Sequence, residues 1–203
     1  GTVNTTISSF VTGAAVNLAG GTMSGTRYHF IDSSLNSKAS ANTSTFSADL
    51  SIRKDYSSTG NLTIDVEDGT AATDLLINGN IIEQLGSNPA ATVTKTGTGT
   101  LVLSGTNNSY TGVTTVTAGT LAVDGTLAAA SAVSVGGAAA TGTPTLSGTG
   151  TVNRSVTINA VSGGAAGTLN PGAVGAIGTL TTGAATINGT LTIDINGAAL
   201  DQL

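Results

Sequence analysis

The chain lacks cysteine and is poor in basic residues, and both features limit what it does. Without cysteine, its 203 residues form neither disulfides nor thiolate metal sites, although cysteine-free chains occur both in the cytosol and outside the cell. Six Lys and Arg residues against eleven Asp and Glu residues give a net charge of −5. This balance argues against nucleic-acid binding, which needs a basic face to neutralise phosphates.

Aromatic and charged residues are also scarce, at 3% and 8% of the chain. Disordered chains usually combine low hydrophobicity with high net charge, but 39% of these residues are hydrophobic and the mean hydropathy is +0.26. The apolar side chains are mostly small or β-branched, which favours many thin layers over one bulky core.

No apolar run approaches the roughly 20 residues of a membrane-spanning helix. No secretory signal is visible, since Gly1 opens directly into strand-like sequence; we interpret the chain as a mature form or a piece of something longer.

The composition changes along the chain and predicts two regions. Residues 1–90 carry most of the charge and five of the six aromatic residues, whereas residues 91–203 are nearly uncharged and contain Tyr110 as their only aromatic residue. The segment 86–89 reads GSNP, a turn signal that places the boundary. We expect residues 1–90 to form a β region that serves as a cap or junction, and residues 91–203 to form a repeat solenoid.

The second region repeats the triplet Gly-Thr-Leu. It occurs at 99–101, 119–121, 125–127, 167–169, 178–180 and 189–191. Steps of about 10 and about 20 residues are typical of half-turns and full turns of a β-solenoid. Each triplet opens a short alternating run bounded by Gly or Asn, which predicts a strand.

The residues expected to point into the core are mainly Leu, Val, Ile and Ala, which suit a narrow coil better than a two-sheet sandwich. In a solenoid each rung stacks on like residues of the next at about 4.8 Å. Because parallel crossover connections are right-handed, we predict an all-β, right-handed parallel β-helix. With about 20–25 residues per rung, the chain makes roughly nine rungs and a rod on the order of 45 Å long.

The repeat resembles a known bacterial family. Residues 94–105 read TKTGTGTLVLSG, residues 107–112 read NNSYTG and residues 118–121 read AGTL. Together they are similar to the autotransporter-associated β-strand repeat, and LNPG at 169–172 and the segment 195–203 resemble what commonly follows it. The resemblance covers about residues 92–203. It implies a right-handed parallel β-helix in a large bacterial protein that is exported and displayed at the cell surface or released. The repeat defines no catalytic site, so we predict that the chain is not an enzyme.

Two features are candidates for a catalytic or metal site. His29 is the only histidine, but no Gly-x-Ser-x-Gly elbow accompanies it, and we expect a structural or surface role for it. Residues 65–69 read DVEDG, and such an oxygen-rich loop holds calcium in some proteins. The spacing fits neither the EF-hand nor the β-roll nonapeptide, so we expect Asp65 and Glu67 on the solvent face of a strand, followed by an Asp-Gly turn.

Glycan cleavage by hydrolysis needs two carboxylates about 5–10 Å apart. In the repeat region Asp124, Asp194 and Asp201 are far apart in sequence. The sequence leaves open whether two of these carboxylates come together on neighbouring rungs. Asp49 and Asp55 are expected to flank turns. We therefore assign no catalytic, cofactor-binding or metal-binding residue and predict no cofactor.

Threonine pairs spaced as Thr-x-Thr occur at 94–96, 96–98, 115–117, 149–151 and 190–192. Stacked on one flat face they would form an ice-binding lattice, but Thr is also a common soluble strand residue and the linear spacing is irregular. Tyr110 is expected to pack over a rung corner.

These features favour a structural, extracellular or cell-surface β-solenoid: a stalk, an adhesin spacer or a self-assembling filament subunit of a bacterium. Its expected partners are a larger surface protein or the cell envelope, and copies of itself docked end to end through open strand edges. Nucleic acid and a membrane-spanning segment are not expected. The alternative is a glycan-binding or glycan-cleaving β-helix, and beyond that an ice-binding threonine array.

Overall fold

The computed structural model describes residues 1–5, 9–12, 14–53, 60–84, 90–128, 132–172, 176–196 and 199–200. Within these residues the chain forms short β-strands and no helix. The sequence dictates this, because glycine and β-branched threonine, valine and isoleucine disfavour helices, while the apolar residues alternate with a period of two.

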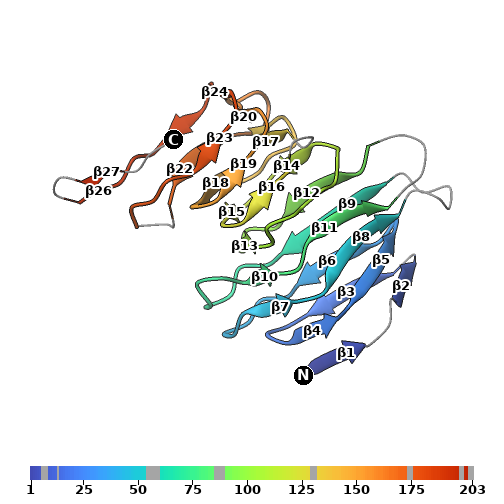
Figure 1. The fold of residues 1–203 in the computed structure, drawn as a ribbon. Coiled ribbons are helices and arrows are strands. Elements are labelled where there is room, and N and C mark those ends of the chain that lie inside the picture. Colours follow the sequence, from blue (N-terminus) through green and yellow to red (C-terminus); the bar gives the residue numbers. More distant parts are fainter. Residues whose placement is uncertain are drawn as a thin grey trace.

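Two long sheets run the length of the molecule and stack their strands in parallel (Figure 1). Long sheet 1 contains, in spatial order, β1 (Thr2–Thr5), β4 (Thr22–Gly25), β7 (Ser44–Phe46), β10 (Leu75–Ile77), β13 (Thr100–Leu103), β15 (Thr120–Val123), β18 (Thr145–Gly148), β22 (Thr168–Pro171) and β25 (Thr190–Leu191). Long sheet 2 contains β3 (Ala15–Leu18), β6 (Ser34–Ser37), β9 (Asn61–Val66), β12 (Thr92–Thr96), β14 (Thr114–Val116), β17 (Val133–Gly137), β20 (Val156–Ile158) and β24 (Ala185–Ile187). The short β21 (Ala165–Ala166) pairs antiparallel with β17.

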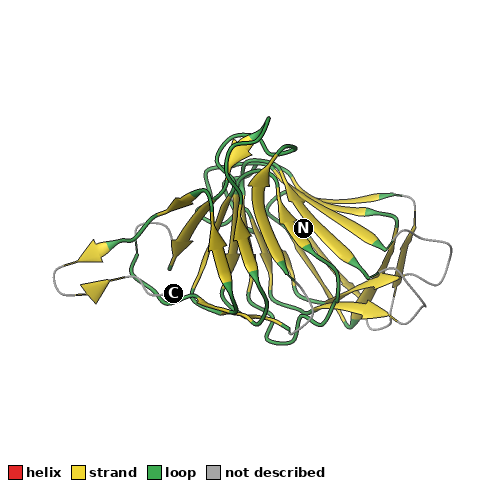
Figure 2. Cartoon of the chain, turned by 90° about the horizontal axis from the view of Figure 1, so that it is seen from above, coloured by secondary structure: helices red, strands yellow, loops and turns green. Residues whose placement is uncertain are grey.

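A third side closes the coil with two shorter sheets. The N-terminal short sheet contains β2 (Ser9–Thr12), β5 (Arg27–Ile31), β8 (Asp49–Arg53) and β11 (Ile81–Gln84). The C-terminal short sheet contains β16 (Thr126–Leu127), β19 (Thr151–Val152) and β23 (Thr181–Thr182). Beyond them, β26 (Ile195–Asn196) and β27 (Ala199–Leu200) pair antiparallel and project from the stack (Figure 2).

Each circuit of the coil passes through long sheet 1, the third side and long sheet 2. The register gives its length, because Thr100 pairs with Thr120, Thr120 with Thr145, Thr145 with Thr168 and Thr168 with Thr190. Each of these four rungs therefore contains 20–25 residues, the length predicted from the sequence. The predicted parallel β-helix is confirmed, and the stacked parallel sheets are consistent with the expected right-handed coil.

Counted along long sheet 1, two of the described rungs are longer than predicted. In these rungs Ser44 pairs with Leu75, and Leu75 pairs with Leu101. In the first of them, part of the extra length lies in the connection 67–74 between β9 and β10, where the chain turns the corner. Extra residues are tolerated at corners because they leave the stacked register unchanged.

Both long sheets continue across residue 90, through the pairs β9 with β12 and β10 with β13. The division into residues 1–90 and 91–203 stays a prediction, and its turn at 86–89 lies outside the described residues.

The core is built from columns of like residues that point inward from successive rungs. On long sheet 1, four leucines pair in register and are fully buried: Leu101, Leu121, Leu146 and Leu169. In the first rungs the filling is aromatic, since the ring of Phe46 lies 5.5 Å from that of Tyr28 and 6.1 Å from that of Phe30. The uniform size of the leucine column along the axis keeps one rung on top of the next.

Glycine is required where corners of successive rungs touch. Gly97 has a φ of +72°, and a Cβ there would lie 2.3 Å from the Val66 carbonyl oxygen. Gly119 has a φ of +61°, and its Cβ would lie 2.5 Å from the Gly99 carbonyl oxygen. Glycine at these two positions therefore permits both the left-handed turn and the close approach of backbones.

Candidate functional site

Lys95 lies fully buried inside the repeat, at an inward position of β12. In the register its neighbours on the adjacent rungs are Ile64 and Val116. One cation therefore interrupts an otherwise apolar column. A charge in such a place is tolerated only when its hydrogen-bonding groups are fully paired.

The pairing of Lys95 is complete. Its Nζ atom donates hydrogen bonds to the carbonyl oxygens of Thr96 at 2.8 Å, Gly97 at 2.7 Å and Ala118 at 3.1 Å. An ammonium has three donors, and here all three are used. Because Ala118 belongs to the next rung, the side chain ties the corner of one rung to the corner of the next.

Burial lowers the pKa of Lys95 to about 8, while the nearby carboxylates of Asp65 and Asp74 act in the opposite direction. The side chain is therefore mostly protonated at neutral pH, as its three carbonyl acceptors require. We conclude that Lys95 fixes the relative position of two successive corners.

Asp74 makes the same kind of connection with the opposite charge. It is 4% exposed, and its two carboxylate oxygens accept from different backbone amides: Oδ1 from Gly69 at 2.8 Å and Oδ2 from Thr100 at 2.8 Å. The carboxylate thus ties the long corner 67–74 to the first residue of β13 on the next rung. Charge-assisted hydrogen bonds of this kind are stronger than neutral ones.

Asn108 lies on the third side of the coil, in the gap between the two short sheets. It is fully buried, and its Oδ1 accepts from the Ile81 amide at 2.8 Å. Its Nδ2 donates to the Gly105 carbonyl at 2.8 Å and to the Thr126 carbonyl at 3.0 Å. One amide side chain therefore connects β11 of the N-terminal short sheet with β16 of the C-terminal short sheet.

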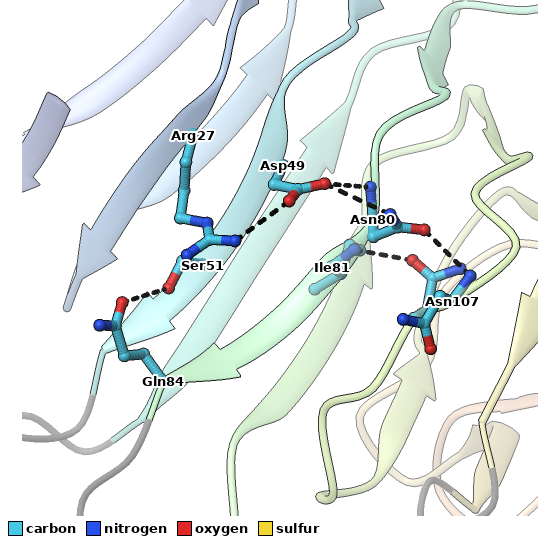
Figure 3. Close-up of polar contacts among 8 residues, drawn as sticks. Arg27, Asp49, Ser51, Asn80, Ile81, Gln84 and Asn107 are labelled. Carbon is cyan, nitrogen blue, oxygen red and sulfur yellow. Dashed lines mark hydrogen bonds and ion pairs between the residues drawn. The ribbon is translucent and has the colours of Figure 1, made fainter. Parts of the chain in front are cut away.

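A ladder of polar side chains follows the corner between long sheet 1 and the N-terminal short sheet (Figure 3). Arg27 forms an ion pair with Asp49 at 3.3 Å. The Asp49 Oδ1 accepts from the backbone amide of Asn80 at 3.2 Å, and the Asn80 Oδ1 accepts from the amide of Asn107 at 2.9 Å. Each contact joins one rung to the next. Asp49, which the sequence predicts beside a turn, is the first residue of β8 and belongs to this ladder.

His29 lies on β5 and is 5% exposed, between the buried Tyr28 and Phe30. In the register it pairs with Ser51 of the next rung. Of the two roles expected from the sequence, structural or surface, this burial does not fit the surface one.

Asp65 and Glu67 of the acidic segment 65–69 each contact a different partner. Asp65 accepts from Thr96 Oγ1 at 2.7 Å, and Glu67 forms an ion pair with Lys38 at 2.6 Å and accepts from the Ala39 amide. The hydrogen bond between Lys38 and Glu67 raises the pKa of the lysine and lowers that of the glutamate. Among the described residues, no group of three or more His, Asp or Glu side chains is placed to hold a metal ion.

The remaining carboxylates considered for catalysis belong to different parts of the chain. Asp124 follows β15 and accepts from the amide and the hydroxyl of Thr149. Asp194 lies between β25 and β26. Asp55 and Asp201 fall outside the described residues.

Tyr110 is the largest fully buried side chain among the described residues, and its hydroxyl is hydrogen-bonded to that of Thr114. It lies in the connection between β13 and β14 and belongs to the buried core.

The threonines form columns that the linear sequence conceals. On long sheet 1 the outward residues Thr100, Thr120, Thr145, Thr168 and Thr190 pair in register. On long sheet 2 the outward column contains Thr63, Thr94, Thr115, Ser134, Thr157 and Thr186. Their irregular spacing in the sequence reflects rungs of different length.

Sequence reasoning missed Lys95, Asp74 and Asn108 as the residues that join rungs. A signal for Lys95 was present, because Val93 and Lys95 alternate with threonines in the strand 92–96, which places the lysine on the inward side. Nothing comparable marks Asp74 or Asn108, whose partners include backbone groups on other rungs.

Stacked rungs tied at their corners are the geometry of a repeat protein, and comparison with known families agrees. Residues 93–123 match the passenger-associated-transport-repeat. The matched segment contains Lys95, Asn108 and Tyr110, and it extends from β12 to β15. The resemblance to autotransporter-associated repeats predicted from the sequence is confirmed in this segment.

The passenger-associated-transport-repeat implies an extracellular or cell-surface location and favours a structural role. No curated protein and no solved structure gives a significant match. Across the residues that the structure describes, no helix has the length and apolarity needed to cross a membrane.

Proposed function

We propose that the chain is a rigid spacer within an exported bacterial surface protein, serving as a stalk or adhesin shaft. The observation that carries this proposal is the continuity of both long sheets, whose strands stay in register from β1 to β25 and from β3 to β24. Such a stack resists bending, because each inner rung is hydrogen-bonded to both of its neighbours.

The use of polar side chains supports the same function. Lys95, Asp74 and Asn108 are buried and direct their hydrogen bonds at backbone groups of adjacent rungs. Their chemistry therefore serves stacking. The repeat match at residues 93–123 supports a place in the passenger part of an exported protein.

A duplication experiment tests the spacer. Thr100 and Thr190 occupy the same position four rungs apart, so duplicating residues 100–189 in the parent surface protein adds four rungs, or about 19 Å at about 4.8 Å each. Electron microscopy with labels at both ends should show that increase and unchanged surface display. An unchanged length, or a flexible bend at the duplication, would refute the proposal.

We also propose an end-to-end contact at the rung of β25. Leu191 continues the column of Leu146 and Leu169 but is 42% exposed, whereas those two are fully buried. A further rung, supplied by a second copy, would bury it. Light scattering should show concentration-dependent growth that Leu191→Glu abolishes; Val161→Glu, at a residue 69% exposed, is the control. A monomer at every concentration would contradict the contact.

A further inference from the structure

The outer face of long sheet 1 carries a cavity of about 260 Å³ that is lined partly by residues of the matched repeat. Its floor comes from two neighbouring rungs, with Thr100 and Val102 of β13 beside Thr120 and Ala122 of β15. Residues 72–73 of the long corner before β10 also line it, as do Asp124 and Ser147. The cavity therefore lies next to the corner that made one rung longer than predicted.

The size and lining define a class of ligand. Pockets that bind drug-sized molecules have volumes of about 300–1,000 Å³, so this smaller cavity suits a single ring. Its surface mixes the hydroxyl-bearing Thr100, Thr120 and Ser147 with the apolar Val102 and Ala122. A pyranose ring presents the same mixture, with C–H groups on its faces and hydroxyls at its edge.

The charge of the cavity lining distinguishes between neutral and acidic sugars. Among the described residues that line the cavity, Asp124 is the one that carries a charge. An acidic sugar would meet a like charge there, while a neutral sugar would donate hydroxyl hydrogen bonds to the carboxylate.

A second observation points to a missing donor. Asn170 follows Ser147 in the same outward column and is 8% exposed, and its Oδ1 has no hydrogen-bond partner within the described part of the chain. Asn170 does not line the cavity itself but lies one register step beyond the lining residue Ser147. Buried polar atoms are nearly always paired, so a hydroxyl donor or a water is expected to complete the pairing of this oxygen.

We propose that this cavity binds one neutral sugar ring of a surface glycan. The spacer then also contacts carbohydrate along its shaft. The described lining residues include no aromatic side chain on which a sugar could stack. Hydrogen bonds therefore supply the affinity, and we expect a single sugar to bind weakly.

Saturation-transfer NMR tests the proposal with glucose, galactose, mannose and N-acetylglucosamine as neutral probes, and galacturonate and sialic acid as acidic probes. We expect signal transfer to at least one neutral probe and weaker transfer to the acidic ones. Thr120→Trp fills the cavity floor and should abolish the transfer. Thr168→Trp changes the same residue type in the same outward column, two rungs along and outside the cavity, and should leave it intact.

Asp124→Asn keeps an acceptor for Thr149 but removes the charge. It should weaken neutral-sugar binding by about tenfold or less, as loss of one charge-assisted hydrogen bond predicts, and reduce the discrimination against acidic probes. Amide spectra establish whether each variant is folded. If Thr120→Trp does not fold, the Asp124→Asn variant provides the test.

Any one of four results would overturn the sugar site: no transfer to any neutral probe, equal transfer in a folded Thr120→Trp protein, unchanged neutral-sugar binding in Asp124→Asn, or equal binding of acidic probes. The duplication experiment does not measure sugar binding, so failure of the sugar site can be told apart from failure of the spacer.

Discussion

At the scale of single residues, the fold depends on polar groups placed inside an otherwise apolar coil. Lys95 is the clearest case, because its ammonium satisfies three carbonyls on two corners. A buried cation does not stabilise a protein by its charge alone, since desolvation offsets the attraction. Its value here lies in geometry: three acceptors converge on one atom and fix the corners relative to each other.

Replacing Lys95 with methionine tests this role. Methionine retains most of the length and removes the three donors, so we expect a loss of about 1–3 kcal/mol in the free energy of unfolding, as for unsatisfied buried carbonyls. Urea titration gives the value. Lys38→Met is the matched control, because Lys38 pairs with Glu67 at the surface. A Lys95→Met protein as stable as the original would show that the ammonium is not needed.

The lowered pKa of Lys95 also predicts a dependence on pH. The pKa is about 8 in the folded chain and 10.5 for the ordinary side chain, so between these values the unfolded chain binds the extra proton. Stability should therefore rise as the pH increases from about 8 to about 10.5, by at most about 3 kcal/mol, and this contribution should be constant below about 8. Denaturation at several pH values measures the slope. A slope that persists in Lys95→Met would assign it to other groups.

At the scale of strands and corners, stacking leaves little room for side chains at certain turns. Gly119→Ala should destabilise the chain through both its φ of +61° and the 2.5 Å approach of the new Cβ to the Gly99 carbonyl oxygen. Gly142 separates the two effects, because its φ is +64° with nothing within 4 Å of the added Cβ. We expect Gly142→Ala to cost about 1–2 kcal/mol from the left-handed backbone, and Gly119→Ala to cost clearly more. Equal thermal-melting shifts would rule out steric contact between corners.

Asn108 is expected to hold the two short sheets together. In Asn108→Ala the Ile81 amide loses its acceptor and two carbonyls lose a donor, so the third side should open locally. Hydrogen exchange at the Ile81 amide should speed up by about tenfold or more, since a tenfold change corresponds to about 1.4 kcal/mol. Asn107→Ala, whose ladder contact uses the backbone amide, is the control. Unchanged exchange at Ile81 would contradict the bridging role.

The Gly-Thr-Leu triplets show how much of the coil the sequence predicts. Those at 99–101, 119–121, 167–169 and 189–191 all fall on long sheet 1, where their Thr and Leu residues lie in the same two columns. The triplet at 125–127 instead opens the C-terminal short sheet, where Thr126 and Leu127 pair with Thr151 and Val152. Alternation and glycine therefore predicted the strands and the inward leucines.

Corner lengths are what the sequence did not predict. They depend on how a connection such as 67–74 packs against its neighbours, which no local pattern encodes. Without them the outward threonine columns stay hidden, because the register between rungs is unknown. The contact between Asp74 and the Thr100 amide is hidden for the same reason, and so are the paired positions that line the cavity.

At the scale of the whole molecule, the chain is a stack in which position along the axis follows from rung number. Backbone ladders that neighbouring rungs share and side-chain ties at the corners hold this arrangement. The spacer function and the sugar site both depend on it, because a rod that bends or slips would neither hold a fixed reach nor align Thr100 with Thr120.

The most direct test is a distance measured along the axis. Since the chain has no cysteine, Thr63→Cys and Thr186→Cys introduce one pair of labelling sites in the same outward column, five register steps apart. Pulsed electron spin resonance between spin labels should give one narrow distribution centred at about 24 Å, from about 4.8 Å per step, broadened only by the labels. A broad distribution, or a centre displaced by more than one rung, would contradict the stacked rod.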